Sequence, residues 1–243
     1  PFRGSDEGQA GMDVIAHFYN NRPEGVMCIK ERPWQGLYAD GITTLDFERG
    51  KAASILEEPW QTDDSIGSSG YNPSKPYMTP DLVVDKLIDI VSKNGNMLLN
   101  IPIKADGKLD AEATTLLQDV GKWFAVNGEA IYGTRPWYMY GEGRNEIGHH
   151  DLESKMTAKD FRYTTKGDVL YAFVLDWPRY GRNPVVFPNI VKMNTRISEV
   201  ASVQLLGHDG ELKWENHGDG LHVTFPKEKP CDYAYALKIT FKK

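Results

Sequence analysis

The period of the hydrophobic pattern changes once along this chain, and that change constrains the fold more than any other feature. Before about residue 140, segments with apolar residues at helical spacing alternate with short apolar runs. This alternation is typical of an α/β fold. We expect helices over residues 8–21, 80–93 and 111–127, and strands near residues 26–29, 43–47, 60–66 and 96–101.

The signals around the second helix are the most specific of these. Thr79 suits the N-cap, Pro80 the first helical position and Asp81 the first turn, and Asn94-Gly95 suits the helix end. The next strand, Asn96 to Ile101, has a continuous apolar centre, which is typical of a sheet covered on its faces. This half therefore reads as the back end of an α/β architecture, with too few βα units for a complete eight-stranded (β/α)-barrel, which takes about 250 residues.

From residue 161 onward the pattern alternates with period 2, which is typical of half-buried strands. Turn-forming clusters such as Lys166-Gly167-Asp168 and His208-Asp209-Gly210 separate these segments. The sequence therefore predicts an antiparallel β-sandwich after a polar linker over residues 141–158. We expect two domains, a partial barrel over residues 1–140 and a β-sandwich over residues 141–243.

Composition excludes several classes of function. A net charge of −6 argues against a nucleic-acid-binding or anionic-membrane surface, and no apolar run approaches the length of a membrane span. Cys28 and Cys231 lie far apart and outside metal-ligand spacing, so we expect unpaired thiols, with a disulfide left open. The first residue is not Met, which leaves a removed leader or a lost N-terminal region open.

Several stretches of the first half resemble one enzyme family. The most specific are Gly95–Pro102 with Ala105-Asp106-Gly107, and Asn127–Trp137. Two further stretches, Asp46–Gly50 and Pro59–Asp63, match a bacterial branch of the same family. On these motifs the chain resembles the C-terminal portion of the family 29 α-L-fucosidases, with dense similarity over residues 10–140.

The resemblance implies a (β/α)-barrel followed by a β-sandwich, and exo-cleavage of terminal α-L-fucose with retention of configuration and no cofactor. Retention needs a nucleophile and an acid/base, both carboxyl groups. In the family the nucleophilic Asp ends a strand just upstream of a segment like Pro1–Gly8, and neither Asp6 nor Asp13 follows an apolar strand. We therefore expect the chain to lack the nucleophile and to associate with itself or with an N-terminal half. The resemblance is compatible with a secreted or periplasmic protein.

Two sites compete for the acid/base. Glu48 ends the strand expected at 43–47, which in a barrel lies at the catalytic rim, although Arg49 beside it would lower the pKa of a carboxyl group. Glu57 and Glu58 form the alternative, of which Glu58 is favoured because Pro59-Trp60 follows, and an apolar neighbour raises a carboxyl pKa. For each of these acids a solvated surface position remains open.

Aromatic and basic residues nearby are candidates for binding the sugar. The resemblance implies an aromatic residue against the apolar face of fucose and a basic residue near its ring oxygen. Core packing or a surface charge is the alternative for each. We expect no metal site, since His149-His150 lies in the polar linker without converging ligands. The candidates are Trp60, Tyr71, Lys30, Arg32 and Trp34.

Two classes of function remain open. The chain is either one side of a fucosidase active site that acts on a fucosylated glycan or fucoside, or a non-catalytic carbohydrate-binding or assembly fragment. Turnover of a fucoside distinguishes the first from the second.

Overall fold

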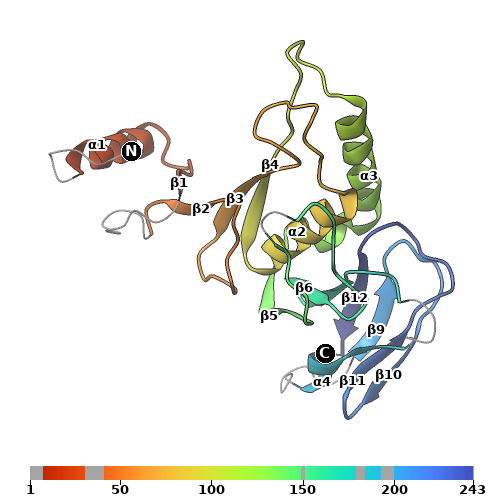
Figure 1. Cartoon of the computed structure of the whole chain (residues 1–243). Helices are drawn as coiled ribbons and strands as arrows, with labels where there is room; N and C mark the ends of the chain where they lie inside the picture. The colour runs from red at the N-terminus through yellow and green to blue at the C-terminus, as the bar shows by residue number, and fades with distance from the viewer. Residues whose placement is uncertain (1–7, 31–40, 149–150, 179–183, 193–199, 243) are drawn as a thin grey trace.

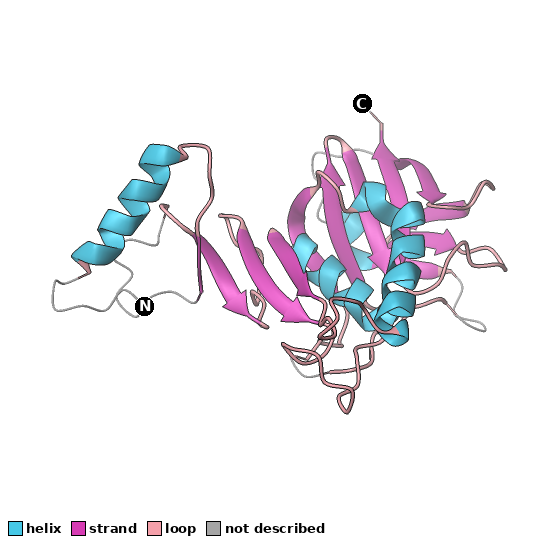
Figure 2. Cartoon of the chain, turned by 90° about the horizontal axis from the view of Figure 1, so that it is seen from above, coloured by secondary structure: helices cyan, strands magenta, loops and turns pink. Residues whose placement is uncertain are grey.

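The computed structural model describes residues 8–30, 41–148, 151–178, 184–192 and 200–242. The first half holds one parallel sheet whose strand order follows the chain, β1-β2-β3-β4. Helix α1 stands on the far side of β1 from α2 and α3 (Figures 1 and 2). The elements are α1 (Gln9–Asn21), β1 (Cys28–Lys30), β2 (Thr44–Glu48), β3 (Trp60–Ser65), α2 (Pro80–Ser92), β4 (Gly95–Asn100) and α3 (Ala111–Asn127).

Local chemistry fixes the helix ends. Pro80 opens α2 with Asp81 in its first turn, and Asn94, in the left-handed region with φ 71°, ends the turn that follows. Asp110 caps α3 by accepting a hydrogen bond from the backbone N–H of Ala113 at 2.8 Å. Thr79 is the N-cap residue of α2, as predicted, but its side chain makes no capping hydrogen bond. Its hydroxyl donates to the carbonyl of Leu152, which ties the helix start to a later segment.

The two faces of the parallel sheet differ in character. On β3, Trp60, Thr62 and Asp64 face α2, where the Lys86 ammonium lies 2.7 Å from Asp64 Oδ2 and both side chains are buried. The alternate residues of the sheet point to the other face. There Leu98 of β4 is 57% exposed, so the expectation that this strand is covered on both faces is wrong for the described residues. Polar side chains, not an apolar layer, dominate this face.

The second half forms two antiparallel sheets. One has the order β5-β6-β7-β12-β9 and the other β10-β11-β8. The prediction of a barrel end followed by an antiparallel β-sandwich is confirmed; the sequence had not indicated β5, β8 or α4. The elements are η1 (Gly128–Ala130), β5 (Arg135–Glu142), β6 (Phe161–Lys166), β7 (Val169–Val174), β8 (Val185–Phe187), α4 (Pro188–Lys192), β9 (Val200–Leu205), β10 (Lys213–His217), β11 (Gly220–Thr224) and β12 (Tyr235–Phe241).

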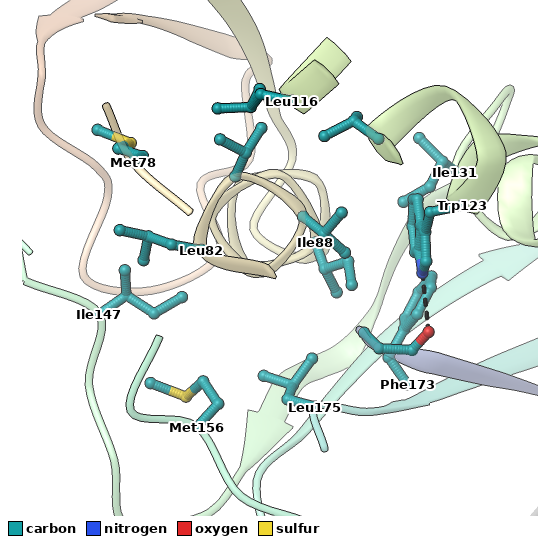
Figure 3. Close-up of a cluster of buried hydrophobic side chains, with 14 of the residues drawn as sticks. Met78, Leu82, Ile88, Leu116, Trp123, Ile131, Ile147, Met156, Phe173 and Leu175 are labelled. Atoms are coloured by element: carbon teal, nitrogen blue, oxygen red, sulfur yellow. Dashed lines mark hydrogen bonds between the residues drawn. The ribbon is translucent and has the colours of Figure 1, made fainter. Parts of the chain in front are cut away.

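One hydrophobic core joins the two halves. Leu82 and Ile88 of α2, Trp123 of α3 and Phe173 of the five-stranded sheet belong to this core, in which the Trp123 ring lies beside Phe173 (Figure 3). Trp123 is 1% exposed, and its indole N–H donates to the carbonyl of Ala234 at 2.8 Å. The barrel-side helices therefore bury their apolar faces against the sandwich.

The segment expected as a polar linker takes part in this core. Ile147 and Met156 are 5% and 7% exposed and belong to the same cluster as Leu82 (Figure 3). Asp160 organises the end of the segment by accepting hydrogen bonds from the backbone N–H groups of Arg144, Asn145 and Thr157. A free linker is thus the wrong description, because the segment is anchored at both ends.

A buried group of charges also links α2 to the five-stranded sheet. We call it the Asp89 cluster: Asp89 and Lys93 of α2, Arg162 of β6, and Lys51. Asp89 Oδ1 lies 2.6 Å from Arg162 Nε, and Asp89 Oδ2 lies 2.8 Å from Lys93 Nζ and 3.3 Å from Lys51 Nζ. The ring of Tyr140 lies 4.5 Å from the Lys93 ammonium.

Two absences apply to the described part of the chain. No helix there combines the length and the apolar character needed to cross a membrane. Cys28 and Cys231 are free thiols, as we predicted. Cys231 is half-buried, whereas Cys28 is exposed and not buried as a free thiol usually is.

Candidate active site

The carboxyl edge of the parallel sheet carries a group of three charged side chains from three neighbouring strands. Lys30 is the last residue of β1, Glu48 is the last residue of β2, and Asp63 of β3 lies opposite Glu48 in the strand register. Because parallel strands end at the same edge, their terminal side chains converge there. We call Lys30, Glu48 and Asp63 the Lys30 group.

One ammonium group bridges the two carboxylates. Lys30 Nζ donates to Glu48 Oε2 and to Asp63 Oδ2, the second at 2.6 Å. These bonds, with Asp63 the larger contributor, raise the pKa of the Lys30 ammonium, so it stays charged. The side chains of Lys30 and Glu48 are about half exposed, and that of Asp63 is 28% exposed. The group is open to solvent and to a ligand.

A further carboxyl group lies one layer below. Asp46 is two residues before Glu48 on β2 and is 6% exposed. Burial raises the pKa of the Asp46 carboxyl, although a hydrogen bond from Gln61 acts in the opposite direction. Within the described residues, Asp46 Oδ1 and Asp63 Oδ1 are buried oxygens without a hydrogen-bond partner. Each can accept a bond from a hydroxyl group or a cation.

Arg49 does not play the part that the sequence suggested. It adopts a left-handed backbone conformation with φ 50°, its N–H donates to the carbonyl of Asp63 at 2.8 Å, and its guanidinium donates to the Ser69 hydroxyl at 3.1 Å. Among the described residues, the cation bonded to Glu48 is Lys30. After Glu48 the chain stays bonded to β3 as far as Gly50, whose carbonyl accepts a hydrogen bond from the Thr62 hydroxyl at 2.8 Å.

The rival carboxylate lies at the opposite edge of the sheet. Glu58 precedes β3, whereas Glu48 ends β2 opposite Asp63, so several residues of β3 separate the two positions. At about 3.3 Å per residue, they stand on the order of 15 Å apart along the strands. Glu58 lines a hollow of about 680 Å³ at the amino edge, together with Tyr19 of α1 and Ile42. Glu48 and Glu58 therefore cannot form one site.

Trp60 belongs to the core and not to a sugar-binding wall. It is 0% exposed, and its indole N–H donates to the carbonyl of Lys93 at 2.8 Å. Its ring packs edge-on against Phe47, with ring centroids 5.2 Å apart. The predicted stacking role is wrong here, because Trp60 points to the face of β3 that α2 covers.

The other predicted sugar-binding residues are placed differently. Tyr71 is 37% exposed on the loop that follows β3, at the same edge as the Lys30 group. Asn100 of β4 ties that loop to the sheet by donating to the carbonyl of Ser69 at 3.1 Å. Arg32 and Trp34 lie outside the described residues, as do His149 and His150.

Sequence reasoning missed Asp63 and Asp46 as members of this site. The signal was present as period-2 polarity, since Asp46 and Glu48 alternate on one strand, as do Gln61 and Asp63 on the next. No group of three or more His, Cys, Asp or Glu side chains in the described ranges is arranged to hold a metal ion. The arrangement fits proton transfer and the binding of hydroxyl groups.

Two family models match the chain. The model described as alpha-L-fucosidase matches residues 4–129, and that described as alpha-L-fucosidase C-terminal domain matches residues 154–240. The alpha-L-fucosidase of Branchiostoma floridae is 34% identical over 168 residues, which are 67% of this chain and 33% of that protein. The tissue alpha-L-fucosidase of Homo sapiens is 30% identical over 203 residues, 79% of this chain and 39% of that protein.

Solved structures agree in fold. Alpha-L-fucosidase isoenzyme 1 from Paenibacillus thiaminolyticus has a TM-score of 0.75 at 23% identity, over 100% of this chain and 57% of its own. The Thermotoga maritima alpha-fucosidase has a TM-score of 0.71 at 23% identity, over 97% and 50%. The chain spans about a third to a half of the length of the curated relatives it matches. Since the first family model alone matches more than half of its residues, this chain belongs to the family 29 α-L-fucosidases and carries their C-terminal domain.

Proposed function

We propose that this chain supplies the acid/base side of an exo-α-L-fucosidase site that releases terminal α-L-fucose from fucosylated glycans or fucosides with retention of configuration. Glu48 is the general acid in the first step and the general base in the second. The observation that carries the proposal is its position as the last residue of β2, at the carboxyl edge of a parallel sheet. That edge is where (β/α)-barrel enzymes place their catalytic groups.

The nucleophile in this proposal comes from outside the four-stranded sheet. A retaining pair of carboxyl groups stands about 5–5.5 Å apart with the anomeric carbon between them. Asp63 lies opposite Glu48, but the Lys30 ammonium bonds to both and fills the space between them. Asp63 is therefore unsuited to attack a sugar held by Glu48. Activity is conditional on an Asp from an N-terminal half of the barrel.

Completion of the sheet is part of the same proposal. Among the described strands, β1 and β4 each have one hydrogen-bonded neighbour, so each presents an edge for a further strand. The open face is mainly polar, with Leu98 as an exposed apolar exception. Association with an N-terminal half, or between two copies, then depends on backbone hydrogen bonds to the outer strands β1 and β4 more than on burial of an apolar layer. Light scattering of the chain alone and with a purified N-terminal half tests this step.

The activity is tested with two substrates of different leaving groups. The chain, complemented by an N-terminal half of the barrel, is expected to release 4-nitrophenol from its α-L-fucoside and fucose from a fucosyl disaccharide. Glu48→Gln should lower kcat/KM for the disaccharide by about 10²–10⁴-fold and kcat/KM for the nitrophenyl fucoside much less, because nitrophenolate leaves without a proton. The kcat for both substrates should fall, because the second step loses its general base. Proton NMR of the first sugar released should show the α-anomer.

Glu58→Gln is the matched control, since it makes the same chemical change at the opposite edge of the sheet. It should leave both rates unchanged. Unchanged disaccharide hydrolysis in Glu48→Gln would remove Glu48 from the mechanism, and release of the β-anomer would contradict retention.

A second candidate function is carbohydrate binding without turnover. The partly exposed carboxylates of Glu48 and Asp63 favour it, because sugar hydroxyls are suitable donors for them. It predicts heat on titration of the chain with fucose and no release of nitrophenol under any complementation. Absence of both heat and turnover would leave an assembly role alone.

A further inference from the structure

The two carboxylates that share Lys30 are placed to compete for it. Lys30, Glu48 and Asp63 come from three adjacent strands, and a single ammonium group donates to both acids. An ammonium has three donors, so two acceptors can be held together or one can be released while the other remains. Asp63 is the more buried of the two acids, at 28% side-chain exposure against 50% for Glu48.

We propose that Lys30 is a positioning residue that sets the charge state of Glu48, and that Asp63 controls Glu48 indirectly by competing for the same ammonium group. This rests on the proposed function, in which Glu48 transfers a proton. Lys30 then acts on the reaction through Glu48, in place of the sugar contact that the sequence suggested for it.

The two halves of a retaining reaction make opposite demands on Glu48. As an acid it must carry a proton, and an ammonium group bonded to it disfavours that form. As a base it must be ionised, and the same ammonium group favours that form. Asp63 gives Lys30 a second partner, so Lys30 can leave Glu48 without losing all its charge pairing. The group thus lets Glu48 cycle between its two forms.

The charges that face Glu48 in the described residues come from each element around it. Strand β1 contributes Lys30, β2 contributes Asp46 from below, and β3 contributes Asp63. Strand β4 places the neutral side chain of Leu98 opposite Asp63. Arg49 donates its guanidinium to Ser69. Lys30 is therefore the cation whose removal should change the titration of Glu48 most.

The experiment is a carbon-13 NMR titration of the carboxyl groups of the full chain, with Glu48 assigned from Glu48→Gln. In Lys30→Met, Glu48 loses its cation and keeps two acidic neighbours, so the midpoint of its carboxyl signal should move to higher pH. In Asp63→Asn, Glu48 keeps Lys30 to itself and loses one acidic neighbour, so that midpoint should move to lower pH.

A double variant separates competition from simple charge. If Asp63 acts through Lys30, Asp63→Asn should shift the Glu48 midpoint much less in the Lys30→Met background than in the wild-type background. Equal shifts in the two backgrounds, or shifts of the same sign in the two single variants, would overturn the proposal. Lys122→Met removes a lysine that is 78% exposed on α3, and it should leave the titration unchanged. Circular dichroism confirms that each variant folds.

The titration needs no turnover, so its failure is distinguishable from failure of the proposed function. Opposed shifts with full disaccharide hydrolysis by Glu48→Gln would support the competition and remove Glu48 as the acid/base. No shift in either variant, with loss of hydrolysis in Glu48→Gln, would overturn the competition for Lys30 and support Glu48 as the acid/base. In an active complemented enzyme, the basic limb of the pH–rate profile should move up in Lys30→Met and down in Asp63→Asn.

Discussion

Arg162 Nε on β6 lies 2.6 Å from Asp89 Oδ1 on α2, and the two side chains are 3% and 0% exposed. This buried ion pair joins the barrel-side helix to the five-stranded sheet. Removal of one partner from an isolated buried pair costs about 3–5 kcal/mol, because the other charge is left uncompensated. Asp89 keeps Lys93 and Lys51 as partners, so we expect Arg162→Met to lower the free energy of unfolding in a urea titration by less than this amount.

The control for that variant is an exposed pair. Lys122 Nζ lies 2.8 Å from Asp119 Oδ1, with the lysine 78% exposed. Lys122→Met should change stability by less than about 1 kcal/mol. Equal changes in the free energy of unfolding for the two variants would show that the buried Asp89 cluster stabilises the fold no more than an exposed ion pair does.

Asp85 and Asp89, one turn apart on α2, should give stability opposite dependences on pH. Burial raises the pKa of Asp85 well above its usual range; Ser154 donates a hydrogen bond to it, and the described residues place no cation within ion-pair distance. Burial would also raise the pKa of Asp89, but Arg162, Lys93 and Lys51 outweigh it and lower that pKa.

The signs follow from linkage. The contribution of Asp85 is fully present below its unfolded pKa of about 4 and is lost as the pH rises through its higher folded pKa. The contribution of Asp89 is present above about pH 4 and is lost as the pH falls through its lower folded pKa. Asp85→Asn should thus match the wild type near pH 4 and exceed it at pH 8, whereas Asp89→Asn should be far less stable at pH 8.

Thermal unfolding at pH 4, 6 and 8 checks both aspartates in one series. An Asp85→Asn variant that becomes less stable than the wild type as the pH rises would contradict the assignment of a raised pKa to Asp85. An Asp89→Asn variant equal to the wild type at pH 8 would contradict the assignment of a lowered one.

Gly95 at the start of β4 leaves room for the Trp60 ring. A Cβ atom at Gly95 would lie 2.5 Å from the Trp60 ring and 2.7 Å from Ile90, closer than packed atoms approach. Gly95→Ala should cost about 1–3 kcal/mol, because the core is overpacked. Gly121→Ala is the control: its Cβ would meet nothing within 4 Å on α3, and the change should stabilise by about 0.5–1 kcal/mol through helix propensity.

Alanine variants of Trp60 and Tyr71 should distinguish a residue that packs in the core from one that contacts the sugar. Trp60→Ala removes a fully buried ring and should cost about 3–5 kcal/mol in the free energy of unfolding. Tyr71→Ala removes a side chain that is 37% exposed at the carboxyl edge, so stability should stay within about 0.5 kcal/mol. In the complex with an N-terminal half, the KM for a fucoside should rise. A large loss of stability in Tyr71→Ala would place Tyr71 in the core and end its candidacy.

Much of the fold follows from local signals. Helix α3 spans the predicted residues 111–127, because a regular apolar face ends at Asn127-Gly128. Strand β5 was missed: Pro136 and Gly141 interrupt its pattern, and its register with β6 shifts between them. The residues of β5 do not themselves show that the segment pairs with β6, which lies later in the chain.

The site was predictable only where strand ends could be counted. Glu48 was placed at the carboxyl edge from its position after an apolar strand, and the structure agrees. The position of Trp60 was predicted wrongly, because the sequence of a strand does not show which of its two faces a helix covers. Which face it takes depends on Ile90 and Gly95, far along the chain. Asp63 was overlooked because its partner Lys30 is 33 residues away.

The hydrogen bond from Trp123 to the carbonyl of Ala234 has a consequence for the time course of synthesis. The two residues are 111 positions apart, and the core around Trp123 includes Ala236 of β12. A ribosome adds about 5–20 residues per second, so α3 emerges several seconds before its partner strand exists. During that interval the apolar face of the nascent helix has no partner strand to cover it. The apolar face of α3 can therefore be buried in the core only after β12 has been translated.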